Sequence, residues 1–260
     1  MRCNIQAQYN VLTMLRSLDA FQEGYTNIAR KSIKECRNEL ERIQVFLLDF
    51  NKVVLASITD CCVRHGDFLP EYQNSLAFTR LLDLLYRTST NILFLSCHGS
   101  YRNAYDDLRH VLEAVIQALY IDRKHPNSSI ETKVEILKEI EDRREYHAVR
   151  LLDEFKQVGH KEELKRKYKE LSQIIHPSHM QILSMRKLVH KAGSDGVVMI
   201  NCPEISQIYD TLREVDDIFF HLFIASFPEF RKSIEKNPEF ILAIKKYRLR
   251  LLSKALKISP

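Results

Sequence analysis

The chain has 260 residues, of which 45% are hydrophobic and 28% charged, and 39 basic against 34 acidic residues give a formal net charge of +5. This length supports one large domain or two small ones, with a core that needs neither disulfides nor a structural metal, and the mild charge permits an acidic partner without requiring one. No stretch reaches the roughly 18 apolar residues of a membrane span, and the N-terminus lacks the apolar core of a signal peptide. We therefore expect a cytoplasmic protein with no membrane span.

The cysteines indicate free thiols. None of the six forms a C-x-x-C pair, and most lie in apolar helical stripes, where a thiol behaves as a small hydrophobe. Cys61, Cys62 and His65 lie within one turn, but a structural zinc normally needs four ligands and no second pair of ligands follows. We expect no metal site and no cofactor.

The clearest periodicity runs from Tyr25 to Cys61, where apolar residues recur every three or four positions. One long helix explains this stripe, and its second half is apolar nearly all round, which predicts burial on several sides. We expect residues 1–66 to form a helical arm that either projects from the protein or provides the surface of a homodimer.

Further helices are predicted at 70–96, 101–122, 128–157, 161–175, 178–193 and 203–227, with two more beginning at Pro228 and Pro238. Ser128 with Glu131 is a capping-box signature for the helix at 128–157. The only β-like run, 197–200, is too short to form a sheet. Short loops favour antiparallel neighbours, so we expect one all-α domain, 1–260, an antiparallel bundle of about eight helices with its core in 67–260.

An ionic stripe follows one side of the helix at 101–122. Its members, spaced at about 100° per residue, are Arg102, Asp106, Arg109, Glu113 and Tyr120. Arg102–Asp106 and Arg109–Glu113 are opposite charges four residues apart. The stripe is either a solvated, salt-bridged edge or a polar ladder facing a cleft, where it would bind an anion.

The second distinctive segment ends the helix at 161–175. Tyr168 and Ser172 share a face there, and Pro177 places His176 at the helix end, with Ser178 just beyond it. A histidine in this position can act as a general base, as a ligand or as a partner of the helix dipole, and the alternative is a helix-terminating His-Pro pair without chemistry.

These two segments carry a resemblance. The pattern G-x-Y-R-x-A-x-x-x-L-R-x-x-L-E at 99–113, followed by L-S-x-x-x-H-P-S at 171–178, resembles an uncharacterised family of prokaryotic all-helical proteins. It extends over about residues 80–180. It implies no established activity, but it implies that such proteins place unusual polar residues at Arg102, Arg109, Glu113, Ser172, His176 and Ser178.

A looser resemblance is to HEPN-type helical bundles, many of which are RNases of toxin or defence systems. Those RNases usually carry Arg and His separated by four to six residues. The chain departs from that pattern, because Arg143/His147 and Arg186/His190 have only three intervening residues.

Two basic segments complete the set of candidate sites. The C-terminal segment carries Lys245, Lys246, Arg248, Arg250, Lys254 and Lys257, and we expect Leu242, Leu249, Leu252 and Leu256 to pack beneath them. The helix at 161–175 carries Lys161, Lys165, Arg166, Lys167 and Lys169. A basic amphipathic helix of this kind binds nucleic acid or a membrane surface, and adjoining basic faces would favour nucleic acid. The alternative is a pair of solvated outer faces. Paired carboxylates such as Asp216 and Asp217 occur on many helices and do not favour one function over another.

The sequence supports two functional hypotheses. The first is a helical interaction or regulatory protein that binds a partner or a small anionic ligand in a polar cleft around Arg109, Glu113 and His176. The second is a HEPN-like nuclease acting on RNA, with His176 as base or orienting group and Arg109 or Arg102 holding phosphate. A metal-dependent hydrolase is disfavoured because the Glu-x-x-His pairs of helical metal sites are absent from the sequence.

Overall fold

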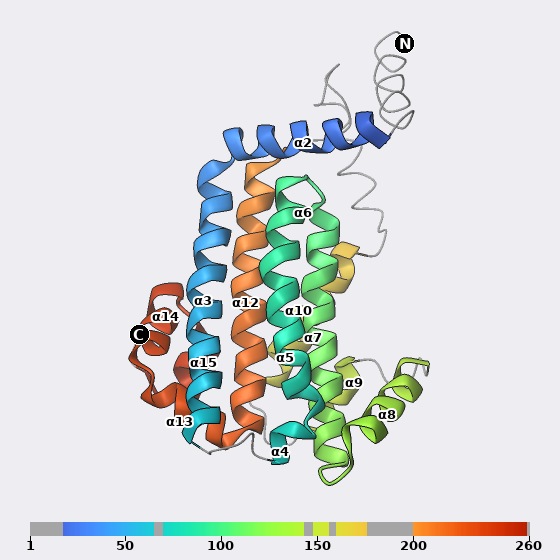
Figure 1. The fold of residues 1–260 in the computed structure, drawn as a ribbon, viewed down its shortest axis with the longest axis vertical. Coiled ribbons are helices and arrows are strands. Elements are labelled where there is room, and N and C mark those ends of the chain that lie inside the picture. The colour runs from blue at the N-terminus through green and yellow to red at the C-terminus, as the bar shows by residue number, and fades with distance from the viewer. Residues whose placement is uncertain (1–17, 65–69, 143–147, 156–159, 176–199, 259–260) are drawn as a thin grey trace.

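The computed structural model describes residues 18–64, 70–142, 148–155, 160–175 and 200–258, and every regular element in these ranges is a helix (Figure 1). This confirms the predicted all-α fold. The elements are α2 (Leu18–Glu35), α3 (Arg37–Arg64), α4 (Pro70–Gln73), α5 (Leu76–Arg87), a π-helical turn (Thr88–Ile92), α6 (Leu93–Cys97), α7 (Tyr101–Lys124), α8 (Ile130–Asp142), α9 (Ala148–Asp153), α10 (Lys161–Ile175), α12 (Cys202–Ser226), α13 (Pro228–Lys236), α14 (Pro238–Tyr247) and α15 (Arg250–Ala255).

Helix α7 is the centre of the bundle. It packs against α5, α10 and α12, and the stripe from Ala104 to Ile121 that faces them is buried. Helix α10 runs antiparallel to α7. This direction is seen at the end of α10, where the Ile175 carbonyl accepts a hydrogen bond from Arg102 at the start of α7. Helix α12 runs in the same direction as α7 (Figure 1). The Tyr101 hydroxyl near the start of α7 accepts a hydrogen bond of 2.8 Å from the N–H of Asn201, just before α12.

The N-terminal helix is bent, so the prediction of one continuous helix from Tyr25 to Cys61 is wrong. Helix α2 crosses the end of the bundle and α3 turns down along its side, with the bend at Cys36 (Figure 1). Backbone hydrogen bonds continue through the bend, from Cys36 to Ser32 at 2.8 Å and from Leu40 to Cys36 at 3.1 Å. The apolar spacing continues with them, so periodicity does not reveal the bend.

Helix α3 packs against α12, α13 and α14. Phe46 lies edge-on against Tyr247 at 4.8 Å between ring centroids, and Phe50 lies edge-on against Phe220 at 5.0 Å. Burial is less complete than the sequence predicts, because Leu48 remains 64% exposed. Helix α3 is therefore buried on one side and open on the other.

The predicted helix at 70–96 is interrupted in the structure, where the segment forms α4, α5, the π-helical turn and α6. Within the predicted helix at 128–157, the described residues form α8 and α9. The residue before α8 is Ser129, whose hydroxyl accepts a hydrogen bond of 3.4 Å from the Thr132 N–H, so the capping position is one residue later than predicted. The predicted helix at 178–193 and residues 197–199 of the β-like run lie outside the described residues.

The helices that follow residue 200 begin where the prolines predict. Helices α12, α13 and α14 all carry proline in their first turn, and Asn201 caps α12 by accepting a hydrogen bond from the N–H of Glu204 at 3.4 Å. Arg248, at φ 52°, then ends α14 in the left-handed conformation, and a further short helix, α15, follows. The expected basic C-terminal helix is thus two helices at an angle. Among the described helices, none has a stretch both long and apolar enough for a bilayer crossing.

Candidate functional site

The ionic stripe of α7 faces α10. The Arg109 guanidinium lies 3.1 Å from a carboxylate oxygen of Glu113 and 3.7 Å from one of Asp106. It also lies 5.7 Å from the centre of the Tyr168 ring, on α10. The side chains of Arg109 and Glu113 are 22% and 21% exposed, so this pair is neither a solvated edge nor a buried core pair.

The contact between α7 and α10, which we call the α7–α10 seam, is defined by Arg102, Arg109, Glu113, Tyr168 and Ile175. Tyr168 lies on its inner side. Its side chain is buried, and burial raises the pKa of its phenol, an effect that the neighbouring Arg109 partly opposes. The phenol is therefore neutral at physiological pH. It acts as an apolar and hydrogen-bonding surface for Arg109, and it does not act as a base.

Arg102 occupies the other end of the seam. Its guanidinium donates a hydrogen bond to the Ile175 carbonyl, one of the carbonyls that a helix leaves free in its last turn. Its positive charge also interacts favourably with the negative end of the α10 dipole. Seven residues, about two helical turns, separate Arg102 from Arg109 on α7 and Tyr168 from Ile175 on α10. The two arginines therefore hold the antiparallel helices in a single register.

The remaining predicted site residues divide into three groups. Tyr120 is partly buried and lies under the Lys124 ammonium, 5.6 Å from its ring centre, about two turns beyond Glu113. Ser172 borders a hollow on the outer side of α10, which Lys165, Arg166, Lys169 and Tyr168 also line. His176 and Ser178 lie outside the described residues. The last described residue of α10, Ile175, contacts Arg102 at the start of α7.

The cations on α10 are mostly committed to neighbouring acids. Lys165 lies 2.5 Å from Asp153, Arg166 lies 2.7 Å from Glu170, and Lys167 lies 2.5 Å from Glu214. The C-terminal basic segment meets α10 at the ion pair between Arg250 and Glu163. The two basic faces thus adjoin, but through alternating charges. Lys165 and Lys167 are only 22% and 12% exposed, so their ion pairs are held more firmly than exposed ones, and this surface offers less to phosphate than its lysine content suggests.

Asp217, the second of two consecutive acids on α12, has a structural role that the sequence pattern does not predict. The Asp217 carboxylate accepts hydrogen bonds from the N–H groups of Leu251 at 2.8 Å and Leu252 at 2.9 Å, and so caps α15 from another helix. Burial raises the pKa of Asp217 to about 6 and that of Asp216 to about 8. The only sequence signal was two acids in an otherwise apolar stretch.

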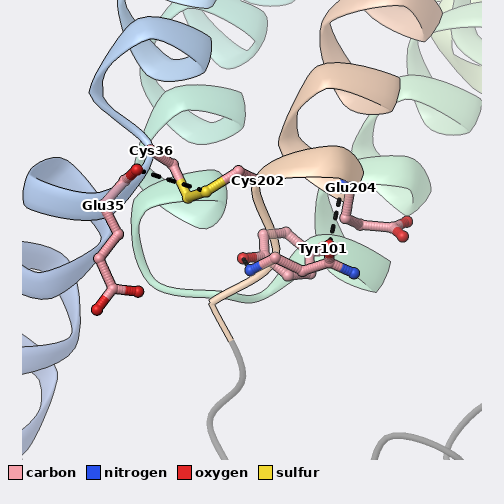
Figure 2. The surroundings of a disulfide bond; sticks show 6 residues. Glu35, Cys36, Tyr101, Cys202 and Glu204 are labelled. Atoms are coloured by element: carbon pink, nitrogen blue, oxygen red, sulfur yellow. Dashed lines mark hydrogen bonds between the residues drawn. A yellow bond between two sulfur atoms is a disulfide. The ribbon is translucent and has the colours of Figure 1, made fainter.

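A disulfide joins Cys36 and Cys202, which contradicts the expectation that all cysteines are free thiols (Figure 2). It ties the bend between α2 and α3 to the first residue of α12. Next to it, Tyr101 holds the backbone of Asn201 (2.8 Å), so three helix ends meet at this point. Periodicity correctly places Cys36 inward but cannot find its partner 166 residues away.

Cys97 is the free cysteine among the described residues, and burial raises the pKa of its thiol. The thiol is therefore protonated and a poor nucleophile at neutral pH. In the described ranges, no three His, Cys, Asp or Glu side chains are arranged to hold a metal ion. The side chains of Cys61 and Cys62, and all of His65, lie outside the description.

A second candidate site is the outer face of α3 with the adjoining part of α14. We call it the α3–α14 face and define it by five exposed residues, Val45, Leu48, Lys52, Leu55 and Leu242. Leu242 is 65% exposed, which corrects the prediction that it packs inward with Leu249, Leu252 and Leu256, all of which are buried. Between the two helices runs a groove lined by Asp49, Lys52, Val53, Glu239, Leu242, Ala243 and Lys246.

Comparisons with protein-family models, with curated proteins and with solved structures give no match to this chain. The resemblances to an uncharacterised prokaryotic family and to HEPN bundles therefore stay predictions.

Proposed function

We propose that this protein is a helical interaction protein that binds a partner protein through the α3–α14 face. The observation that carries the proposal is the exposure of Leu48, Leu55 and Leu242 on neighbouring helices, beside a groove. Single exposed apolar residues are common on any protein surface, whereas a group of them rimmed by charges is typical of a binding surface. Asp49, Glu239 and Lys246 supply that charged rim.

A small anionic ligand at the α7–α10 seam is the less favoured form of the same hypothesis. Arg109 already has Glu113 and Asp106 as partners, and Arg102 donates to a backbone carbonyl. An anion would have to displace these contacts, so the seam is better suited to holding α7 against α10.

Action on RNA is also less favoured. The paired cations of α10 lower its positive potential, and the Arg–His spacing of HEPN RNases is absent from the sequence. His176, the base that this hypothesis requires, lies outside the described residues.

Site-specific photo-crosslinking tests the proposal. A photoreactive amino acid replaces Leu48 in the full chain, and the matched control carries it at Gln173, which is exposed on α10. We expect a discrete protein adduct in cells from position 48, no such adduct from position 173, and loss of the adduct when Leu55→Glu is added. Equal labelling at both positions, or none at position 48, would overturn the proposal.

A further inference from the structure

The open side of α3 repeats with the spacing of a coiled coil. A stripe of its exposed residues, spaced at alternating steps of four and three, consists of Glu41, Val45, Leu48, Lys52, Leu55 and Thr59. In heptad terms, Val45 and Lys52 occupy a positions, and Leu48 and Leu55 occupy d positions. Apolar residues at a and d positions pack as knobs into the holes of a facing helix, and a single lysine at an a position specifies the register of the pair.

We infer that the partner at this face is a second copy of the same chain, paired through α3 in antiparallel orientation with Glu41 of each copy opposite Lys52 of the other. The inference rests on the proposed function, because it identifies the protein that binds the α3–α14 face. A pair of identical chains related by a two-fold axis uses one surface twice, so the surface must complement itself.

Charge decides between the two orientations. Parallel pairing would place Lys52 against Lys52 and Glu41 against Glu41, which opposes like charges in two layers. In an antiparallel pair, a positions face d positions, and the register that sets Val45 against Leu48 also sets Glu41 against Lys52. The four central layers are then two apolar layers flanked by two ion pairs, and Leu55 lies at the margin.

The charged residues of the stripe are available for this pairing. Within one chain, Glu41 contacts Arg37 at 2.7 Å and Lys52 contacts Glu239 at 3.5 Å, and all four side chains are more than half exposed. Exposed ion pairs of this kind contribute little and exchange readily. The bend at Cys36 directs α2 away from the stripe, so the pairing segment ends there.

The size of the stripe sets the expected affinity. The four layers from Glu41 to Lys52 span about 16 Å of helix, roughly three turns, and Leu55 extends the contact at each end. Such a contact is smaller than a standard stable interface, although Leu242 widens it beside Lys52. We therefore expect a reversible, concentration-dependent dimer with Kd on the order of micromolar.

Sedimentation equilibrium of the full chain, over a concentration series, tests the pairing. The variants are Glu41→Lys, Lys52→Glu and the two combined, and Lys169→Glu on α10 is the charge-matched control. Each single reversal places like charges in two layers, and we expect it to raise Kd roughly tenfold or more. The combined reversal restores opposite charges and should return Kd to about the wild-type value, and Lys169→Glu should leave it unchanged.

The outcomes separate this inference from the proposed function. A wild-type dimer without rescue in the combined variant would overturn the antiparallel register. A monomer at every concentration, together with an adduct of position 48 to a different protein, would overturn self-pairing and leave the proposed function in place. A monomer without any adduct would overturn both. Circular dichroism checks that each variant is folded, and Glu41→Gln and Lys52→Gln replace any reversal that unfolds.

Discussion

Lys133 and Asp122 form a nearly buried ion pair that joins three helices. The Lys133 ammonium, on α8, lies 3.0 Å from Asp122 at the end of α7, and it also donates to the Asn74 carbonyl at 2.5 Å. Asp122 in turn accepts hydrogen bonds from the backbone of Leu76 and Ala77, both at 2.9 Å, and so caps the start of α5. Each charge therefore has several partners, which a buried ion pair needs in order to be tolerated.

The first prediction concerns this pair. Lys133→Met should lower the free energy of unfolding by about 3 kcal/mol or more, because it leaves the Asp122 carboxylate with an uncompensated charge in a site where the Lys133 side chain is 2% exposed. The control is Lys138→Met on the same helix, where the exposed pair with Glu135 should be worth under about 1 kcal/mol. Urea denaturation measures both changes, and equal losses would show that the pair has no special role.

The second prediction concerns Glu113 at the α7–α10 seam. Glu113→Ala should cost about 1–2 kcal/mol, between the values for exposed and buried pairs, because Arg109 keeps Asp106 and Tyr168 as neighbours. A double-mutant cycle with Arg109→Ala, followed by chemical denaturation, isolates the coupling. Glu170→Ala, which breaks an exposed pair with Arg166, is the comparison. If Glu113→Ala costs no more stability than Glu170→Ala, the Arg109–Glu113 pair behaves as a solvated surface pair.

Apolar periodicity and proline positions predicted most of the helices, because both act locally. Pro203, Pro228 and Pro238 lie in the first turns of α12, α13 and α14, as expected. The bend at Cys36 could not be predicted, since the disulfide that accompanies it joins residues 166 positions apart. Helix α15 was also missed, because its cap, Asp217, comes from another helix and Arg248 ends α14 without a glycine.

For the candidate sites, too, the sequence predicted what depends on one helix and missed what depends on contacts between helices. The spacing of Arg102 and Arg109 predicted one face of α7, and that face does meet α10 at Ile175 and Tyr168. The neutralisation of Lys165 and Lys167 by Asp153 and Glu214 depends on which helices are neighbours, which a pattern within one helix does not contain. The apolar stripe through Ile43, Phe50 and Val54 did predict the buried side of α3. The apolar residues Val45, Leu48 and Leu55 gave no sign that the opposite side stays open.

The third prediction concerns the disulfide. Reduction, or Cys202→Ser, should lower stability by about 2–5 kcal/mol, because the bond closes a long loop in the unfolded chain. Thermal melts with and without reductant measure the loss, with Cys97→Ser as the control that should retain the response to reductant. Peptide mapping without reduction identifies the Cys36–Cys202 link. A melting temperature that reductant leaves unchanged in wild type would contradict this assignment.

The fourth prediction concerns the pH dependence that Asp216 imposes. Burial, assisted by the neighbouring Asp217, raises the pKa of Asp216 from its ordinary value of 3.8 to about 8 in the folded chain. The folded state therefore holds this proton more tightly than the unfolded state, so the contribution to stability is complete below about pH 4 and is lost as the pH rises through about 8. Asp216→Asn removes the ionisation, and it should stabilise the protein by about 2 kcal/mol or more at pH 9 and much less at pH 4. Urea unfolding at both pH values measures this difference, and Asp210→Asn, exposed on the same helix, should show no such dependence. A stabilisation by Asp216→Asn that is the same at both pH values would mean that the carboxyl does not titrate in this range.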